Sequence, residues 1–231
     1  MSIQKFTRPI LDFLYPPVCI SCGKLLQDGS QKVCNDCWKA IPQVTQYLPL
    51  YQETRLKLLS EGNISDLVSC FVFEKEGPFQ DIAHALKYKE YKSLGVELGI
   101  CIGEALKERN LGIDILIPVP LHRIKQRERG YNQSEFIARG IAAVTGNPVV
   151  SNAVRRIRHT TSQTKLTLEE RRKNMDHAFE PIPCSTNILS GKKCLLVDDV
   201  ITSGATIHSC AQVLHSAGAA IVIAASAALA E

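Results

Sequence analysis

The chain has 231 residues, a formal net charge of +4 and a hydrophobic fraction of 45%. This length and composition predict an ordinary packed domain with a small appendage. Its apolar runs are shorter than the roughly 18–20 residues of a membrane-spanning helix. The N-terminus, which carries Asp12 and has no long apolar stretch, is a poor signal peptide. We therefore expect a cytoplasmic protein.

Nine cysteines divide into a group of four near the N-terminus and five scattered ones, which we expect to pack as small buried side chains. The group of four has the spacing C-x2-C-x11-C-x2-C, which supplies the four thiolates of a tetrahedral metal site. Soft ligands in a reducing compartment favour zinc. An iron–sulfur cluster is less compatible with the short ribbon spacing, and disulfides are disfavoured in the cytoplasm. Four ligands close the coordination shell, which predicts a structural role. The predicted ligands are Cys19, Cys22, Cys34 and Cys37.

Prolines bound the cysteine motif, with one adjacent pair before it and two further prolines after it. They delimit a module of about 45 residues, short enough to need a metal for its stability. Trp38, beside the last ligand, is expected to pack over the metal site. We predict a zinc-ribbon module over residues 1–45, a linker over 46–66 and a second domain over 67–231; within the linker, residues 48–59 are read as either linker or helix.

The second domain alternates predicted strands with predicted helices, the pattern of an α/β fold with a mostly parallel sheet. Its strands are rich in β-branched and aromatic residues, and its helices have apolar residues at helical spacing. The predicted strands cover residues 67–73, 113–119, 149–151 and the apolar C-terminal tail, 219–230; the predicted helices cover 79–88, 94–106 and 136–144.

Positive charge is concentrated in the centre of the chain. Residues 122–173 carry 12 Lys and Arg against 4 Asp and Glu, a local charge of +8. Such a segment suits an anionic ligand, either pyrophosphate, nucleic acid or both, although a solvated surface has the same composition. Within it, residues 158–174 are polar, basic and without a sustained apolar period, which predicts a long loop that acts as a lid.

Residues 192–206 read as a buried strand, two adjacent carboxylates and a small-residue turn that opens a helix. The apolar run Cys194–Val197 suits a central parallel strand, and α/β sheets bind ligands at the carboxyl ends of such strands. Carboxylates there accept hydrogen bonds from vicinal ribose hydroxyls. The turn and the helix over 205–217 present backbone N–H groups to a phosphate. Adjacent aspartates also occur in Walker B segments, but the chain has no Gly-Lys-Ser/Thr partner motif.

This stretch resembles the motif that binds phosphoribosyl pyrophosphate (PRPP) in type I phosphoribosyltransferases. The resemblance implies that Asp198 and Asp199 hold the ribose 2′- and 3′-hydroxyls and that magnesium binds together with PRPP. It also implies that the turn cradles the 5′-phosphate. The cradle would consist of Thr202, Ser203, Gly204, Ala205 and Thr206.

The order of the motifs along residues 19–206 resembles that of the ComF family, competence-associated phosphoribosyltransferase-like proteins whose relatives include GntX. The resemblance rests on the cysteine ribbon, 118–121, 129–134, 163–166, 171–174, 178–179 and the PRPP motif. It implies an α/β, type I phosphoribosyltransferase (Rossmann-like) domain with a small N-terminal zinc ribbon. It also places Lys87 near a family lysine and implies a pyrophosphate-binding loop. That loop would consist of Val119, Pro120, Leu121 and His122, with added charge from Arg127 and Arg129.

The family resemblance implies a function in natural transformation, in the uptake or inward transport of single-stranded DNA through a PRPP-binding domain. It does not supply a transferase reaction or a catalytic residue, so two alternatives stay open. One is an active salvage-type phosphoribosyltransferase that moves phosphoribosyl from PRPP to a base or amine. The other is a non-catalytic PRPP-sensing regulator or DNA adaptor. The expected partners are PRPP or a related ribose phosphate, single-stranded DNA and the DNA-uptake machinery, which would bring a cytoplasmic protein to the inner membrane.

The basic segment is the candidate surface for DNA. Phosphate contacts there would bind a single strand, and Tyr131 is predicted to stack on a base. Arg155 and Arg156 are expected to lie outside the phosphate pocket, so that changing them would affect DNA and spare PRPP.

Overall fold

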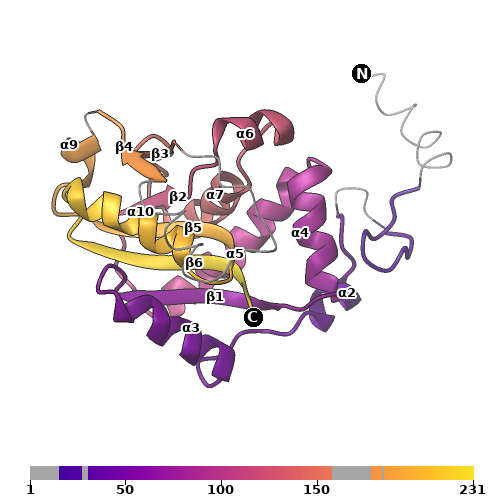
Figure 1. Ribbon diagram of the computed structural model, residues 1–231. Coiled ribbons are helices and arrows are strands. Elements are labelled where there is room, and N and C mark those ends of the chain that lie inside the picture. The colour runs from indigo at the N-terminus through magenta and orange to yellow at the C-terminus, as the bar shows by residue number, and fades with distance from the viewer. Residues whose placement is uncertain (1–15, 28–30, 158–177, 184) are drawn as a thin grey trace, which may run out of the picture.

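A computed structural model describes residues 16–27, 31–157, 178–183 and 185–231 (Figure 1). Its centre is a four-stranded parallel sheet with the strand order β1-β6-β5-β2. The inner strands β5 and β6 are buried along most of their length, as expected for parallel strands that are covered on both faces. The strands are β1 (Asp66–Phe73), β2 (Ile115–Pro118), β5 (Lys193–Ile201) and β6 (Ile221–Ala230).

Helices cover both faces of the sheet (Figure 1). One face carries α4 (Pro78–Tyr88), α5 (Lys92–Glu108) and α7 (Gln133–Thr145), and the other carries α3 (Pro49–Ser60) and α10 (Ala205–Ser216). The short helix α6 (Arg123–Arg129) directly follows β2, and the short helix α9 (Ser185–Leu189) directly precedes β5. In the part of the chain that the structure describes, no helix is long and apolar enough to cross a membrane.

Helices α5 and α7 approach so closely that only glycine fits where they cross. A Cβ atom at Gly99 would lie 2.0 Å from the carbonyl oxygen of Ile137, and one at Gly140 would lie 2.1 Å from that of Val96. Glycine inside a helix costs about 1 kcal/mol relative to alanine. The two glycines therefore lower the helix propensity of α5 and α7, but they allow the backbones of the two helices to come into direct contact.

The described part of the ribbon packs on the α/β domain through an aromatic row. The ring of Trp38, in helix α2 (Asn35–Ala40), lies 6.0 Å from the ring of Phe71, which lies 5.8 Å from that of Phe79. Ile41, just after α2, is buried. Trp38 thus connects the ribbon to β1 and α4.

Both outer strands of the sheet form further backbone hydrogen bonds. Along β1, the Val44 N–H donates to the Cys70 carbonyl and the Val72 N–H donates to the Pro42 carbonyl, each at 2.8 Å. At β2, Leu116 exchanges hydrogen bonds of 2.9 and 2.8 Å with the segment 148–150. The chain that leaves the ribbon therefore covers the edge at β1.

Most of the predicted elements are present, but the strand predicted over 149–151 is wrong. Val149 forms only an isolated bridge to Leu116, because a turn at residues 151–152 carries the chain away from the sheet. The strand that follows is β3 (Val154–Arg156), which pairs antiparallel with β4 (Phe179–Pro181). The lid predicted over 158–174 lies outside the described residues.

Two further predictions meet the structure in part. Within the predicted linker, residues 49–60 form α3, whose Tyr51 and Leu58 are buried. Among the scattered cysteines, Cys194 and Cys210 are buried, Cys70 and Cys101 are half-buried, and Cys184 lies outside the described residues.

Candidate functional site

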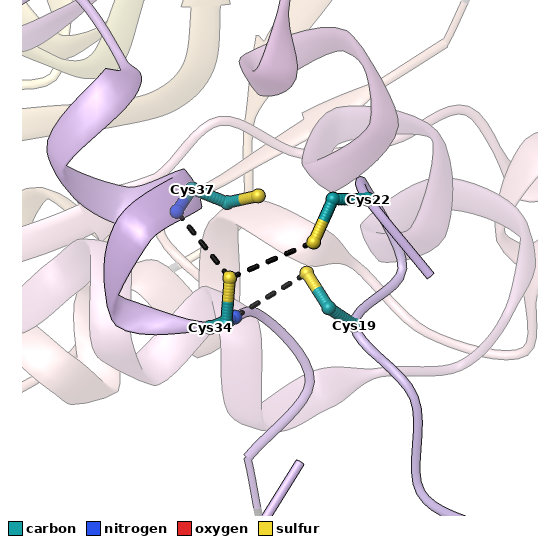
Figure 2. Close-up of side chains that lie close together, drawn as sticks. All are labelled: Cys19, Cys22, Cys34 and Cys37. Atoms are coloured by element: carbon teal, nitrogen blue, oxygen red, sulfur yellow. Dashed lines mark hydrogen bonds between the residues drawn. The ribbon is translucent and has the colours of Figure 1, made fainter. Parts of the chain in front are cut away.

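The four predicted metal ligands come together in the ribbon (Figure 2). Their Sγ atoms all lie within 4.8 Å of one another, and those of Cys22 and Cys34 are 3.7 Å apart. Four sulfur atoms at about 2.3 Å from a tetrahedral zinc ion are about 3.8 Å apart. The cluster therefore has the dimensions of a zinc site.

Backbone hydrogen bonds favour the thiolate form at Cys19, whereas burial and the neighbouring thiols raise the pKa of Cys37 to about 12. The Cys34 N–H donates to Cys19 Sγ at 3.3 Å, and the Cys37 N–H donates to Cys34 Sγ at 3.4 Å. Burial raises the pKa of Cys19, but backbone hydrogen bonds from Cys22, Cys34 and Ser21 outweigh burial and lower that pKa to about 6. Because the thiolate is the metal ligand, this environment fits a structural zinc ion.

A second site lies at the carboxyl end of the sheet, where β2 and β5 run side by side. Asp198 and Asp199 lie near the end of β5. Val119, the first residue of the predicted pyrophosphate loop, follows β2 and donates its N–H to the Val197 carbonyl at 2.8 Å. The two predicted halves of the PRPP site therefore meet at one edge of the sheet, where open α/β folds bind ligands.

Each carboxylate of this pair has a side-chain partner from a helix. Lys87, near the end of α4, places its Nζ 2.8 Å from Asp199 Oδ2. Ser134, in the first turn of α7, donates its hydroxyl to Asp198 Oδ1 at 3.1 Å. The Asp199 N–H donates to the same oxygen at 2.9 Å. The ends of α4 and α7 thus fix the orientation of both carboxylates.

These contacts separate the pKa values of the two aspartates. Burial and the charge of Asp199 raise the pKa of Asp198 to about 8. Burial also acts to raise the pKa of Asp199, but the Lys87 ammonium outweighs it, and the pKa of Asp199 is lowered. The site therefore holds one neutral and one ionised carboxyl near neutral pH.

Asp198→Asn is expected to change how stability depends on pH. Because folding raises the pKa of Asp198 from about 3.9, the stabilisation by its neutral form is complete below about pH 4. It is lost as the pH rises through about 8. Asparagine stays neutral. The melting temperature of the wild type should therefore fall relative to that of the variant as the pH rises from 5 to 8. Asp199 titrates below this interval. A difference in melting temperature between the wild type and the variant that is the same at pH 5, 6.5 and 8 would contradict the prediction.

The predicted phosphate cradle is the turn between β5 and α10. Gly204 adopts a positive φ of 79° immediately before α10 begins at Ala205. A Cβ atom at Gly204 would lie only 2.7 Å from Leu58 Cδ2. The glycine therefore meets two demands, a left-handed backbone and close packing on α3. Of the remaining cradle residues, Thr202 is exposed, and Ser203 and Thr206 are partly exposed.

Helix α6 follows the predicted pyrophosphate loop and carries its two arginines. The His122 side chain caps α6 by accepting a hydrogen bond from the Ile124 N–H at 3.3 Å. Arg129 donates to Gln133 Oε1 at 3.0 Å, and Arg127 is exposed in the last turn. Pro120 and Leu121, between Val119 and His122, are partly exposed.

Two predictions about this region are wrong. Tyr131 is only 7% exposed, and its hydroxyl donates to the Leu86 carbonyl, so it is not available to stack on a base. Arg156 lies at the site rather than outside it, because a backbone bridge joins β3 to His122. Burial lowers the pKa of Arg156, and the nearby charge of Asp198 opposes that effect. Arg155, by contrast, is half exposed and pairs with Glu180.

Several contacts of the site were not predicted from the sequence. Ser134 holds Asp198, and Asn132 donates from Nδ2 to the Val119 carbonyl at 3.0 Å. Both lie in the family-like run 129–134, which was therefore a usable signal. Lys87 was noted only by family position. Arg156 lies in a short basic strand, and nothing in its local pattern indicates that it lies near Asp198.

Comparisons with known proteins agree with this architecture. The family model described as "Phosphoribosyl transferase domain" matches residues 130–230, and that described as "Double zinc ribbon domain" matches residues 10–48. Together with the parallel sheet and the cysteine cluster, these matches define an α/β protein of the type I phosphoribosyltransferase class with an N-terminal zinc ribbon.

Curated relatives of the chain include competence proteins and DNA utilization proteins. Competence protein F of Haemophilus influenzae is 28% identical over 87% of this chain and 80% of its own length. Competence protein ComFC of Bacillus subtilis is 27% identical over 88% of this chain and 73% of its own. DNA utilization protein YhgH of Escherichia coli K12 is 30% identical over 63% of this chain and 64% of its own. The chain is similar to these competence and DNA utilization proteins, which supports a ComF-family protein.

Solved structures with similarity to the chain include an amidotransferase and a phosphoribosyl transferase. Glutamine PRPP amidotransferase from Bacillus subtilis is 19% identical with a TM-score of 0.41, over 62% of this chain and 30% of that one. Adenine phosphoribosyl transferase from Trypanosoma brucei is 11% identical with a TM-score of 0.43, over 82% and 87% of the two chains.

Proposed function

We propose that this chain is a ComF-type competence protein that acts in natural transformation, in the uptake or inward transport of single-stranded DNA, through a PRPP-binding domain. The observation that carries the proposal is the Asp198–Asp199 pair, which lies beside the Val119–His122 loop and is held by Lys87. The names of the relatives, competence protein and DNA utilization protein, support the biological context.

In this proposal the carboxyl groups of Asp198 and Asp199 bind the ribose hydroxyls of PRPP, and the turn 202–206 receives the 5′-phosphate. The turn leads directly into α10, whose N-terminal N–H groups favour a phosphate. The pyrophosphate lies along residues 119–122, with charge from Arg127 and Arg129. Magnesium, when bound with PRPP, neutralises the pyrophosphate charge. Lys87 neutralises Asp199 before the ligand arrives, and an incoming pyrophosphate competes for its ammonium group.

Two alternatives follow from the same site. A salvage-type transferase would release pyrophosphate from PRPP when a base or amine acceptor is added. A PRPP-sensing regulator or DNA adaptor would bind PRPP without turnover. Pyrophosphate release assayed with a panel of acceptors separates the first alternative from the second.

The proposal extends to the organisation of the chain. We assign residues 1–45 to the ribbon, 46–66 to the connection and 67–231 to the PRPP-binding domain. In the cell we place the protein in the cytoplasm, with access to the inner membrane through partners of the uptake machinery.

Asp199→Asn is expected to remove most of the stabilisation that PRPP with Mg²⁺ gives. A ligand at 100 times its dissociation constant stabilises the folded state by about 2.7 kcal/mol. For a chain of this size that corresponds to a rise of roughly 5–10 °C in melting temperature. The matched control is Asp81→Asn, an exposed aspartate on α4 that should leave the rise intact. Equal rises in both variants would show that PRPP binds elsewhere.

The function itself is tested by complementing a deletion strain of the native host. The strain receives either the wild-type gene or one that encodes Asp198→Asn with Asp199→Asn. We expect the double variant to reduce transformation strongly while DNA still reaches the cell surface. Normal transformation by a stably expressed double variant would mean that competence does not use this pocket.

A further inference from the structure

We propose that the end of α4 and helix α6 form a surface that binds single-stranded DNA, with Tyr88 stacking on a base. This inference rests on the proposed function, because it gives that function a DNA contact. We call it the α4–α6 surface. Its residues are Tyr88, Arg123, Ile124, Lys125, Arg127 and Arg129.

Tyr88 is the aromatic anchor of this surface. It is the last residue of α4, and it is 62% exposed. The Arg129 guanidinium lies 5.5 Å from the centroid of the Tyr88 ring, and the His84 ring lies 5.0 Å away at an interplanar angle of 44°. An aromatic ring held by a neighbouring cation, yet open to solvent, is the platform on which unpaired bases stack.

Charge complementarity favours a polyanion as the occupant. Helix α6 has the sequence Arg-Ile-Lys-Gln-Arg-Glu-Arg, with four basic residues and one acidic residue. That acidic residue, Glu128, pairs with Lys125 at 2.8 Å. Among the described residues, the exposed Arg123 and Arg127 have no ion pair with a carboxylate. Glu90, whose carboxylate lies close to Gly130, is an acidic group at the border of this surface.

The chemistry of the surface fits a single strand better than a duplex. In a duplex the base faces are stacked on one another, whereas a single strand offers them to an exposed ring. Ile124, which is 46% exposed, adds an apolar contact beside the cations of α6. Tyr131 is buried, whereas Tyr88 is exposed and can be reached by a base.

The surface adjoins the PRPP site through the chain itself. Tyr88 follows Lys87, whose ammonium reaches Asp199, and Arg127 and Arg129 are shared with the proposed pyrophosphate loop. Figure 1 shows α6 and the end of α4 near each other on the same side of the molecule. A strand on this surface would therefore pass beside the mouth of the PRPP site.

The first test measures binding of a fluorescein-labelled dT20 strand by anisotropy. Because stacking of one base is worth about 1–3 kcal/mol, Tyr88→Ala should weaken binding about tenfold or more, whereas Tyr88→Phe should retain it. The control is Tyr47→Ala, which removes a tyrosine that is 77% exposed and precedes α3. On a strand of the same length without bases, Tyr88→Ala should bind as the wild type does. An equal loss on both strands would overturn the stacking role.

The second test measures the salt dependence of the same binding. Each phosphate of a single strand that a basic side chain neutralises adds about 0.7 to the slope of log affinity against log salt. Arg123→Ala with Lys125→Ala, which removes two such contacts, should therefore reduce the magnitude of the slope by about 1.4. Lys57→Ala with Lys107→Ala, which removes two exposed lysines from α3 and α5, should leave it unchanged. Salt-independent binding, equal slopes in the two double variants, or tighter binding to a 20-base-pair duplex would overturn the proposal.

The PRPP melting shift, measured on the same variants, separates this inference from the proposed function. Tyr88→Ala and Arg123→Ala with Lys125→Ala should keep the shift while their dT20 affinity falls. A retained shift with unchanged dT20 affinity would reject the α4–α6 surface alone. Absence of the shift in the wild type would reject the PRPP site, and the dT20 results would still decide the DNA surface.

Discussion

Cys34→Ser is expected to abolish metal binding and to detach the ribbon from the α/β domain. Serine keeps the side-chain cap of α2, because Cys34 Sγ accepts the Cys37 N–H as the N-cap of that helix and the serine hydroxyl is a favoured N-cap acceptor. The change thus removes one sulfur from the cluster and little else. Structural zinc in small modules is worth on the order of 10 kcal/mol, and that binding energy is folding energy. The zinc content should fall from about one ion per chain to nearly none.

The same variant has a spectroscopic readout, because Trp38 is the single tryptophan of the chain. The Trp38 ring should separate from Phe71, and its emission should move to longer wavelength, while most of the far-ultraviolet circular dichroism remains. Cys101→Ser, which alters a half-buried cysteine outside the cluster, should keep both the zinc and the emission. Full zinc content in Cys34→Ser would contradict the assignment of the ligands.

Gly99→Ala is expected to destabilise the protein by more than about 3 kcal/mol, above the usual cost of overpacking. The added methyl group would meet the Ile137 carbonyl oxygen at 2.0 Å, and a backbone atom inside a helix has no rotamer by which to move away. Helices α5 and α7 would have to separate along their whole contact. Urea unfolding should show the destabilisation as a lower midpoint.

Gly112→Ala is the matched control, because a Cβ atom at Gly112 meets nothing within 4 Å. It should change the midpoint little, and Gly140→Ala should reproduce the effect of Gly99→Ala. A midpoint for Gly99→Ala within experimental error of the Gly112→Ala value would show that the two helices can separate at little cost.

The sequence predicted the elements whose periodicity is long and clear. The strand before Asp198 is a continuous apolar run, and the helix over 94–106 repeats its apolar face, so both were recognised. The segment 149–151 failed because three residues carry too little pattern to separate a bridge from a strand. The close crossing at Gly99 was also missed, since glycine within a helix signals lower propensity and does not reveal its neighbour.

For the candidate sites, the sequence predicted many of the residues that lie there, but it did not predict the contacts between their side chains. The spacing of the cysteines is local, so the zinc ligands followed directly from it. The contact between Lys87 and Asp199 joins residues 112 positions apart and depends on how α4 ends beside the sheet. Arg156 reaches the site only because β3 joins His122 through a bridge, and Tyr131 is buried because its hydroxyl finds the Leu86 carbonyl. Such tertiary contacts leave no trace in local spacing.

The chain that leaves the ribbon has a consequence for solubility. Residues 42–44 occupy the hydrogen-bonding groups of β1 around Cys70 and Val72, which is the position where a strand from another molecule would add to the sheet. Unpaired outer strands promote association between molecules. A ribbon that holds its zinc keeps this segment in place, so metal supply would also govern whether copies of the protein stay apart. Loss of the zinc would therefore be expected to free the outer edge of β1 for pairing with another molecule.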